Sequence, residues 1–372
     1  LGSQIAGQVP DFDESRYVRP KDLPHVSRVT PLAIAAVEEA LCDAGIDPTV
    51  MTRDELRRIA VIVGSGGGSQ AFTEHQYRLY FEGLQKQCSV YVVPTSTIGT
   101  LASEVSMRFG FRGFSHVVST GCTSSSDAVG YAWRQIQCGA ADTIIAGGVD
   151  APISELIMRG FLLMRIMSTR WNQCPQKASR PFSRDRDGFV VAEGAWFFVM
   201  EERERAIARG AHIYGEITGY GSTCEAYHRV RLEECGEEPA RAITLALDEA
   251  GLPPEAIQYV NYHGTSTELN DRIETRAVKL AFGRHAYKLA GSALKSLIGH
   301  PQGACGAAGI AATLLAMRDG VVHPTKNVDV PDPECDLDYV PDIGRRVDID
   351  AAVVNCIAFG SKNSAIVLQR HD

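Results

Sequence analysis

The sequence predicts an α/β fold with mainly parallel sheets, and two observations support this prediction. Short apolar runs typical of buried strands alternate along the chain with segments of helical pattern, as in folds whose helices connect parallel strands. Glycine occurs 35 times, at the ends of these segments rather than in a linker. The predicted strands cover residues 58–65, 116–120, 142–150, 196–202, 213–222, 259–264, 351–361 and 364–370, and the predicted helices cover residues 31–44, 99–109, 124–138, 239–251, 268–282 and 303–318.

A short motif occurs once in each half of the chain. A helix ending in a glycine turn reads LCDAGIDP at 41–48 and LDEAGLPP at 247–254, and a strand follows each copy. Self-similarity of this kind indicates an internal duplication. We therefore predict two halves, residues 1–208 and 209–372. The chain begins in loop-like residues, so we expect the opening strand of the first half to be missing from this sequence.

Composition excludes several classes of protein. The chain has 372 residues, 45% of them hydrophobic, and a net charge of −8, as in an ordinary globular protein without a basic stripe for nucleic acid. No apolar stretch approaches the roughly 20 residues of a membrane-spanning helix, and no signal-peptide pattern opens the chain, so a cytoplasmic location is expected. The ten cysteines form no CxxC pair. We expect no metal site and no disulfides, and most cysteines as small buried residues.

Cys122 lies between a predicted strand and a predicted helix, in VVSTGCTSSSDAVGYA (117–132). Backbone N–H groups and the helix dipole at a helix N-terminus favour a thiolate. A sharp turn at this point would also expose the sulfur, as a nucleophile elbow does. On this segment alone, a buried packing cysteine remains an equal alternative.

His263 follows a strand in NYHGTSTELND (261–271), where open α/β sheets bind ligands. The hydroxyl groups of Thr265 and Thr267 could hold an amide-bearing arm, and a helix cap is the alternative. Lys295 and His300 occur together in SALKSLIGHPQGACGAAG (292–309). A lysine beside an imidazole can set charge and proton position, although a surface lysine and a capping histidine are equally open.

Phe359 stands between Ala358 and Gly360 in NCIAFGSKNS (355–364). A loop of this kind can present a backbone N–H as an oxyanion donor, and a core phenylalanine at a turn is the alternative. A cysteine, two histidines and an oxyanion loop together form a coherent set for acyl transfer.

These motifs, taken together, resemble a known family. The chain contains STGCTSSSDAVGYA, ASRPFSRDRDGFVVAEGA, YVNYHGTST, NDRIET, LKSLIGH and AFGSKNSA in the order found in the β-ketoacyl-acyl-carrier-protein synthases, condensing enzymes of the thiolase superfamily. Within that family, RGAHIYGEITGYGSTCEAYH, NDRIETRA and PDPECDLDYVP are most similar to the catalytic ketosynthase subunit of type II polyketide synthases.

The resemblance implies a duplicated thiolase fold with five α-β-α-β-α layers and a decarboxylative Claisen condensation in polyketide or fatty-acid elongation. Cys122 would accept an acyl chain from the phosphopantetheine of an acyl carrier protein. His263 and His300 would bind the malonyl thioester and stabilise the enolate that forms as CO2 leaves. The N–H groups of Cys122 and Phe359 would form the oxyanion hole. No resident cofactor is implied, since phosphopantetheine arrives on the carrier protein.

The resemblance also implies roles for surrounding residues. Lys295, paired with Glu274, would organise the histidines. The remaining implied residues are Asp271 as a supporting residue, Thr265 and Thr267 at the pantetheine arm, Phe359 and Gly360 in the gatekeeper loop, Gly67, Val92 and Phe161 along the acyl tunnel, and Arg165 and Lys21 for carrier-protein docking. The small Gly67 would leave a deep acyl pocket.

Two departures from the family pattern occur in these motifs. Gly309 stands where the family usually has glutamate, and Ala358 where it usually has glycine. Two other functions are open: a non-catalytic chain-length-factor subunit, which would lack the nucleophile, and a coenzyme A-dependent thiolase, which would use a second cysteine in the last loop as its base, close to where Cys356 lies. The expected partners are the carrier protein and either an identical chain or a chain-length-factor-like subunit, paired along residues 116–120. No nucleic acid or membrane partner is expected.

Overall fold

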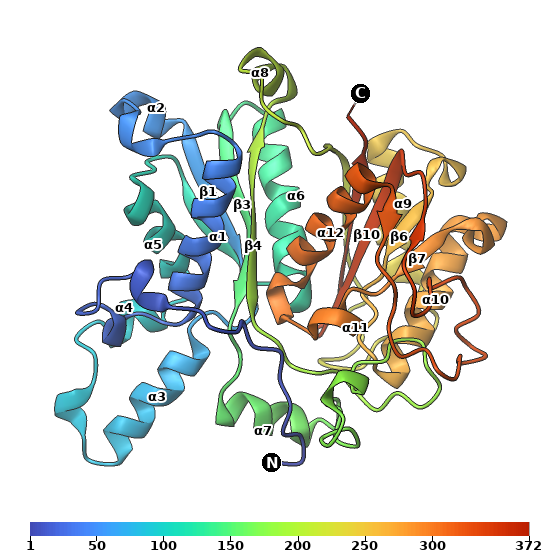
Figure 1. Ribbon diagram of the computed structural model, residues 1–372, viewed down its shortest axis with the longest axis horizontal. Helices are drawn as coiled ribbons and strands as arrows, with labels where there is room; N and C mark the ends of the chain where they lie inside the picture. The colour runs from blue at the N-terminus through green and yellow to red at the C-terminus, as the bar shows by residue number, and fades with distance from the viewer. Residues whose placement is uncertain (372) are drawn as a thin grey trace.

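Two mixed β-sheets form the frame of the protein, and helices cover both faces of each (Figure 1). The computed structural model describes residues 1–371. The first sheet has the order β2-β1-β3-β4 and the second β5-β11-β10-β6-β7. The strands are β1 (Ile59–Gly64), β2 (Ser115–Val118), β3 (Thr143–Asp150), β4 (Gly194–Glu201), β5 (Glu216–Cys224), β6 (Tyr259–Asn261), β7 (Ala290–Ser292), β10 (Ala351–Ala358) and β11 (Lys362–Gln369), and β8 (Val321–Val322) pairs with β9 (Arg345–Arg346).

The helices lie in three layers around the two sheets. The layer between the sheets contains α6 (Ser124–Gln137) and α12 (Cys305–Asp319). The outer layers contain α1 (Val29–Asp43) and α5 (Thr100–Phe109) on the first sheet, and α9 (Glu237–Ala250) and α10 (Glu268–Phe282) on the second. This is the five-layer duplicated thiolase fold that the resemblance implies. Shorter helices are α2 (Arg53–Arg57), α3 (Gln70–Phe81), α4 (Val92–Ser96), α7 (Glu155–Leu163), α8 (Arg203–Ala208) and α11 (Lys295–Ile298).

The predicted strands and helices are all present, within a few residues of the expected bounds. The two copies of the glycine-turn motif end α1 and α9, which occupy equivalent outer layers. The expectation of mainly parallel sheets is wrong, because β4, β5 and β11 pair antiparallel to their neighbours. The sequence reading missed the three-residue strand β7, whose Ala, Gly and Ser carry little β propensity.

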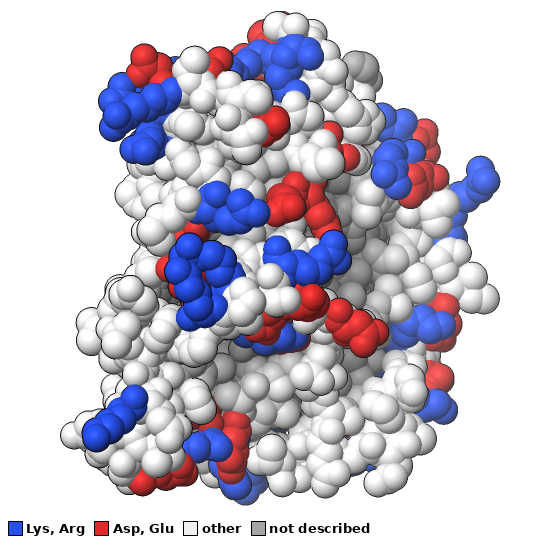
Figure 2. Space-filling view, turned by 60° about the vertical axis from the view of Figure 1, so that its left-hand side comes forward, with Lys and Arg blue, Asp and Glu red and all other residues white. Residues whose placement is uncertain are grey.

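The cysteines are less buried than expected. Only Cys122, Cys305, Cys335 and Cys356 are buried, and all ten are free thiols. Several of the others lie where elements end, for example Cys138 at the C-terminal cap of α6. Among residues 1–371, none of the helices is both long and apolar enough to cross a membrane. Acidic and basic side chains interleave on the face seen in Figure 2, which shows no large patch of one sign.

The two halves of the molecule pack against each other where α6 contacts β5. Tyr220 of β5 is buried and donates a hydrogen bond of 2.7 Å from its hydroxyl group to Asp127 Oδ1 on α6. Its ring lies against Gly130, where an added Cβ would stand 2.4 Å from the ring carbon Cδ2. A glycine at this position of α6 therefore makes room for an aromatic side chain from the other half.

We expect Gly130→Ala to lower the free energy of unfolding by about 1–3 kcal/mol, because the methyl group overlaps the Tyr220 ring. Gly160→Ala in α7 is the matched control, since an added Cβ there meets nothing within 4 Å. That change should be neutral or stabilise by about 0.5–1 kcal/mol through helix propensity. Urea denaturation measures both, and equal effects of the two substitutions would contradict the packing described for Tyr220.

Candidate active site

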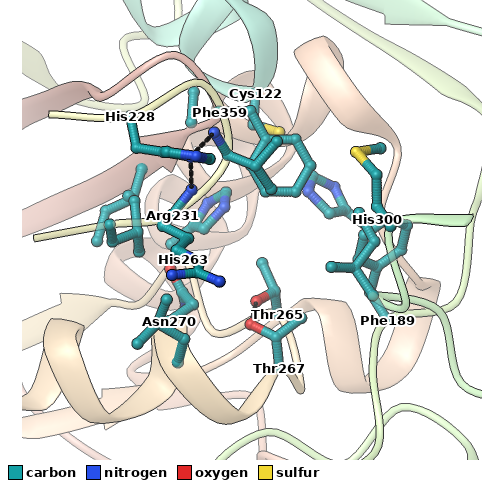
Figure 3. Close-up of a pocket in the computed structure, with 17 residues that line it drawn as sticks. Cys122, Phe189, His228, Arg231, His263, Thr265, Thr267, Asn270, His300 and Phe359 are labelled. Carbon is teal, nitrogen blue, oxygen red and sulfur yellow. Dashed lines mark hydrogen bonds between the residues drawn. The ribbon is translucent and has the colours of Figure 1, made fainter. Parts of the chain in front are cut away.

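A cavity of about 360 Å³ brings Cys122, His263 and His300 together (Figure 3). The three residues come from different segments: the turn after β2, the loop after β6, and the turn before α12. One donor atom from each lies within 4.8 Å of the others, and all three side chains are buried. The structure therefore brings together three residues that are far apart in the chain and that the sequence analysis assigned to one site.

Cys122 lies in a short 3-10 turn, Gly121–Thr123, directly before α6. Gly121 has φ of +71°, a backbone conformation that glycine adopts without strain. Burial raises the pKa of the Cys122 thiol to about 12, and the Lys295 charge and the Phe359 N–H oppose this rise. The expected thiolate is therefore not the form that the resting protein favours, because burial penalises the charged sulfur. Cys122 rests as a neutral thiol.

The two histidines are neutral and present the same ring nitrogen to the cavity. Burial, followed by the Lys295 charge, holds the pKa of each well below its ordinary value. His300 Nδ1 accepts the Gln302 N–H at 3.2 Å, and His263 Nδ1 lies 3.3 Å from Lys295 Nζ, which donates to it. Both Nδ1 atoms are acceptors, so both protons reside on Nε2. Two neutral N–H donors result.

Lys295 does not pair with Glu274, so that prediction is wrong. Lys295 Nζ donates to the backbone carbonyl of His263 at 2.6 Å. The Glu274 carboxylate instead accepts the N–H groups of His263 at 2.6 Å and Gly264 at 2.8 Å, and the Asn355 amide at 2.7 Å. Among residues 1–371, Lys295 and Glu274 form no ion pair with each other. The backbone N–H groups of the His263 loop thus take up the hydrogen-bonding capacity of the Glu274 carboxylate. Burial raises the pKa of Glu274 to about 7.

Asp271 supports the same loop from the first turn of α10. Its carboxylate accepts the N–H of Thr265 at 3.1 Å and that of Phe182 at 2.9 Å, beside the buried Arg186. The hydroxyl groups of Thr265 and Thr267 lie 2.9 Å apart and both residues line the cavity. The loop therefore presents a pair of hydroxyl groups next to the two imidazoles.

Phe359 stands at the tip of the tight hairpin between β10 and β11 and lines the cavity. Its N–H faces the Cys122 sulfur. The Gly360 N–H donates to the Arg229 carbonyl at 2.9 Å and so points away from the Cys122 sulfur. Ser361 Oγ donates to the His228 carbonyl at 2.9 Å. These bonds fasten the hairpin to the segment 225–232.

The three residues predicted along the acyl tunnel do not line this cavity, so their role in a tunnel stays a prediction. Gly67 lies in the loop after β1, where its N–H donates to Asp150 at 3.1 Å and an added Cβ would face Gln70. Val92 begins α4 and is half-buried. Phe161 packs edge-on against Phe189, with ring centroids 5.4 Å apart, behind the cavity wall. Arg165 and Lys21 are both exposed.

Gly309 is explained by its neighbours. A Cβ at this position would stand 2.8 Å from Asn261 Oδ1 and 3.0 Å from Val354 Cγ1, so α12 packs too closely for a glutamate side chain.

Among residues 1–371, two groups of side chains have donor atoms close enough together to be compared with a metal site, and both groups include His263. The Lys295 ammonium beside His263 Nδ1 opposes a cation at either group.

Sequence reasoning missed three residues of the site. Asp150, at the end of β3, accepts hydrogen bonds from the Ser65 hydroxyl at 2.7 Å and from the N–H of Gly303 at 2.7 Å. An acidic residue closing an apolar run was the available signal. His228 and Arg231 line the cavity from the loop after β5, where nothing in the local pattern marks them.

The chain is similar over most of its length to known proteins of one family. Residues 3–206 match the family model of the beta-ketoacyl synthase N-terminal domain and residues 214–329 that of its C-terminal domain. The chain is 39% identical to 3-oxoacyl-acyl-carrier-protein synthase 2 of Synechocystis, covering 99% of this chain and 88% of that protein. It is 41% identical to the tetracenomycin polyketide synthase ketoacyl synthase alpha subunit of Streptomyces glaucescens, covering 99% and 87%.

Solved structures give the same result. A type II polyketide ketosynthase, solved bound to the hexaketide and in complex with its acyl carrier protein, superposes with a TM-score of 0.90 at 32% identity, covering 100% of this chain and 89% of the other. The ishigamide ketosynthase/chain length factor gives a TM-score of 0.90 at 30% identity with the same coverage.

We expect Lys295→Met to raise the pKa of both His263 and His300, since the lysine charge is the second cause of each lowered value. NMR titration of ring-labelled histidines measures this. In the wild type both rings should stay neutral as the pH falls through about 6.5, the ordinary histidine value. Because their folded pKa values lie below the unfolded one, they lower stability progressively below that pH.

The exposed Lys288, changed to methionine, is the control for this substitution and should leave both titrations unchanged. Unaltered or lowered pKa values in Lys295→Met would show that the lysine charge does not act on the two rings.

Proposed function

The chain belongs to the β-ketoacyl synthase family, and from this premise we propose which of its residues perform the condensation. Its relatives are β-ketoacyl-acyl-carrier-protein synthases and type II polyketide ketosynthases, so its reaction is Claisen condensation in acyl-chain elongation. The observation that carries the assignment is the convergence of Cys122, His263 and His300 in one cavity, with donor atoms within 4.8 Å. Cys122 is the acyl acceptor, and the two histidines bind the malonyl unit.

In the acyl transfer, the Cys122 sulfur attacks the thioester carbonyl of the acyl carrier protein. As the new S–C bond forms, the Cys122 thiol gives up its proton, which goes to the departing pantetheine sulfur because both imidazoles already carry a proton on the nitrogen that faces the cavity. The carbonyl oxygen becomes negative and is accepted by the N–H groups of Cys122 and Phe359. The bond to the pantetheine sulfur then breaks, the electron pair leaves with that sulfur, and the proton follows it.

In the condensation, the Nε2–H groups of His263 and His300 donate to the malonyl thioester carbonyl. The C–C bond to the carboxylate breaks, CO2 leaves, and the electron pair remains as an enolate. Each donor aimed at the enolate oxygen is typically worth about 3 kcal/mol. The enolate carbon attacks the Cys122 thioester, the S–C bond breaks, and the cysteine sulfur takes up a proton. The product is a β-ketoacyl-acyl carrier protein.

We propose the acyl carrier protein as the substrate donor, with no resident cofactor and a cytoplasmic location, and we retain Lys21 and Arg165 as docking candidates. A second subunit, identical or chain-length-factor-like, would pair antiparallel with β2. Two features support this pairing: β2 is an edge strand of the first sheet, and a relative was solved as a ketosynthase/chain length factor. The matched family models support a boundary between the halves at 208 and 209.

The two alternative functions are less well supported. A chain-length-factor subunit would lack the nucleophile, and Cys122 is present at the centre of the cavity. A thiolase would need a second cysteine as base. Cys356 is buried beside Cys305 outside the cavity lining, and its pKa is raised well above the ordinary value, first by the hydrogen bond with Cys305.

We expect Cys122→Ala to abolish acylation of the enzyme by acyl-acyl carrier protein, because no other thiol lines the cavity among residues 1–371. Cys305→Ala and Cys356→Ala are matched controls from the same buried cluster and should still gain one acyl group. Intact mass spectrometry reports each result. Acylation of Cys122→Ala, or chain extension with acetyl-coenzyme A but not malonyl-acyl carrier protein, would overturn the proposal.

A further inference from the structure

Arg231 is a charged residue at the rim of the cavity that the reaction above does not use. We propose that its guanidinium binds the phosphodiester of the carrier protein's phosphopantetheine arm and so positions the arm for both half-reactions. This inference rests on the proposed function and extends it to the outer end of the substrate.

The backbone around Arg231 is fixed on both sides. The N–H groups of Val230 and Arg231 both donate to His228 Nδ1 at 3.0 Å, which closes a tight turn. The next residue, Leu232, is buried against Ile273 and Ile357. Figure 3 shows Arg231 on the side of the cavity formed by His228, His263 and Asn270, across from His300 and Phe189. The turn therefore aims this side chain at the cavity.

The Arg231 guanidinium has no acidic partner within the described chain. Across residues 1–371, its side chain takes part in no ion pair and no hydrogen bond. Other arginines near the site are paired, as Arg186 is with Asp332 at 2.6 Å. Guanidinium carries five N–H donors and no acceptor, and it matches the oxygens of a phosphate in bidentate geometry. An unpaired guanidinium at an apolar rim is thus available to an anion.

Burial decides which anion reaches Arg231. Cys122 and His263 are buried, Thr265 is buried, Thr267 is half-buried and Arg231 is exposed, so these residues mark a path from the inner end of the cavity to its rim. When the thioester carbonyl of the malonyl unit lies at the inner end of the cavity, the malonyl carboxylate also lies there. The phosphodiester, at the other end of the pantetheine arm, then lies at the rim. A cation on the malonyl carboxylate would also stabilise the charge that decarboxylation removes, and so slow the reaction.

The test compares two malonyl donors, malonyl-phosphopantetheine and malonyl-pantetheine, with enzyme already acylated on Cys122. Arg231→Gln should raise the KM for the phosphorylated donor about tenfold, the scale of one charge-assisted contact, with kcat unchanged. The KM for malonyl-pantetheine should not change. Arg231→Lys should recover part of the loss, because it keeps the charge but not the fork.

Arg229→Gln is the matched control, because Arg229 lies on the same loop, is exposed, and does not line the cavity. It should leave both donors unaffected. Equal loss with both donors in Arg231→Gln would place the malonyl carboxylate at this arginine and overturn the inference, as would no loss with either. Failure of the proposed function has a different signature, namely no condensation by the wild type with any donor, or condensation by Cys122→Ala.

Discussion

The site depends on buried carboxylates that bind backbone N–H groups, and Asp150 is the one that joins the loop after β1 to the His300 turn. It accepts hydrogen bonds from the loop after β1, at Ser65, Gly66 and Gly67, and from Gly303 in the turn that follows His300. A carboxylate without solvent is tolerated only when donors of this kind surround it. Gly303 must be glycine, because a Cβ would stand 2.2 Å from the Gly66 nitrogen. The His300 turn is thereby held against the end of the first sheet, beside the turn that carries Cys122.

Glu274 performs the same task for the other histidine. It binds the backbone N–H groups of His263 and Gly264, while Asp271 binds that of Thr265. Each catalytic imidazole is thus positioned through the backbone of its loop, and within residues 1–371 no acidic side chain contacts either ring. An acid on either ring would favour the imidazolium. Positioning through backbone amides lets both rings stay neutral and donate from Nε2.

The long strand and helix patterns predicted the elements of the fold, and the resemblance carried by the motifs around Cys122, His263 and His300 implied the five layers and the convergence of these three residues. The sequence did not predict their partners. A motif identifies a lysine and a glutamate but not which atoms within 4 Å they meet, so Lys295 and Glu274 were paired wrongly. The prediction of a thiolate at Cys122 was wrong for a related reason. The position of Cys122 at a helix N-terminus is visible in the sequence, but its burial is not. Gly67 and Val92 were assigned to the acyl tunnel from the family resemblance alone, and neither lines the cavity that holds Cys122.

The reacting groups of the resting site are neutral. The Cys122 thiol and the two imidazoles are neutral, and Glu274 lies on backbone amides rather than on Lys295. The Lys295 ammonium lies 3.3 Å from His263 Nδ1 and donates to the His263 carbonyl, and among residues 1–371 no carboxylate contacts it. Every intermediate of the condensation is an anion: the cysteine sulfur, the tetrahedral oxyanion and the enolate. A positive charge in a desolvated cavity stabilises each of these in turn, and it does so more strongly than a lysine that is paired with a carboxylate. The absence of that ion pair is therefore what suits this cavity to anionic intermediates.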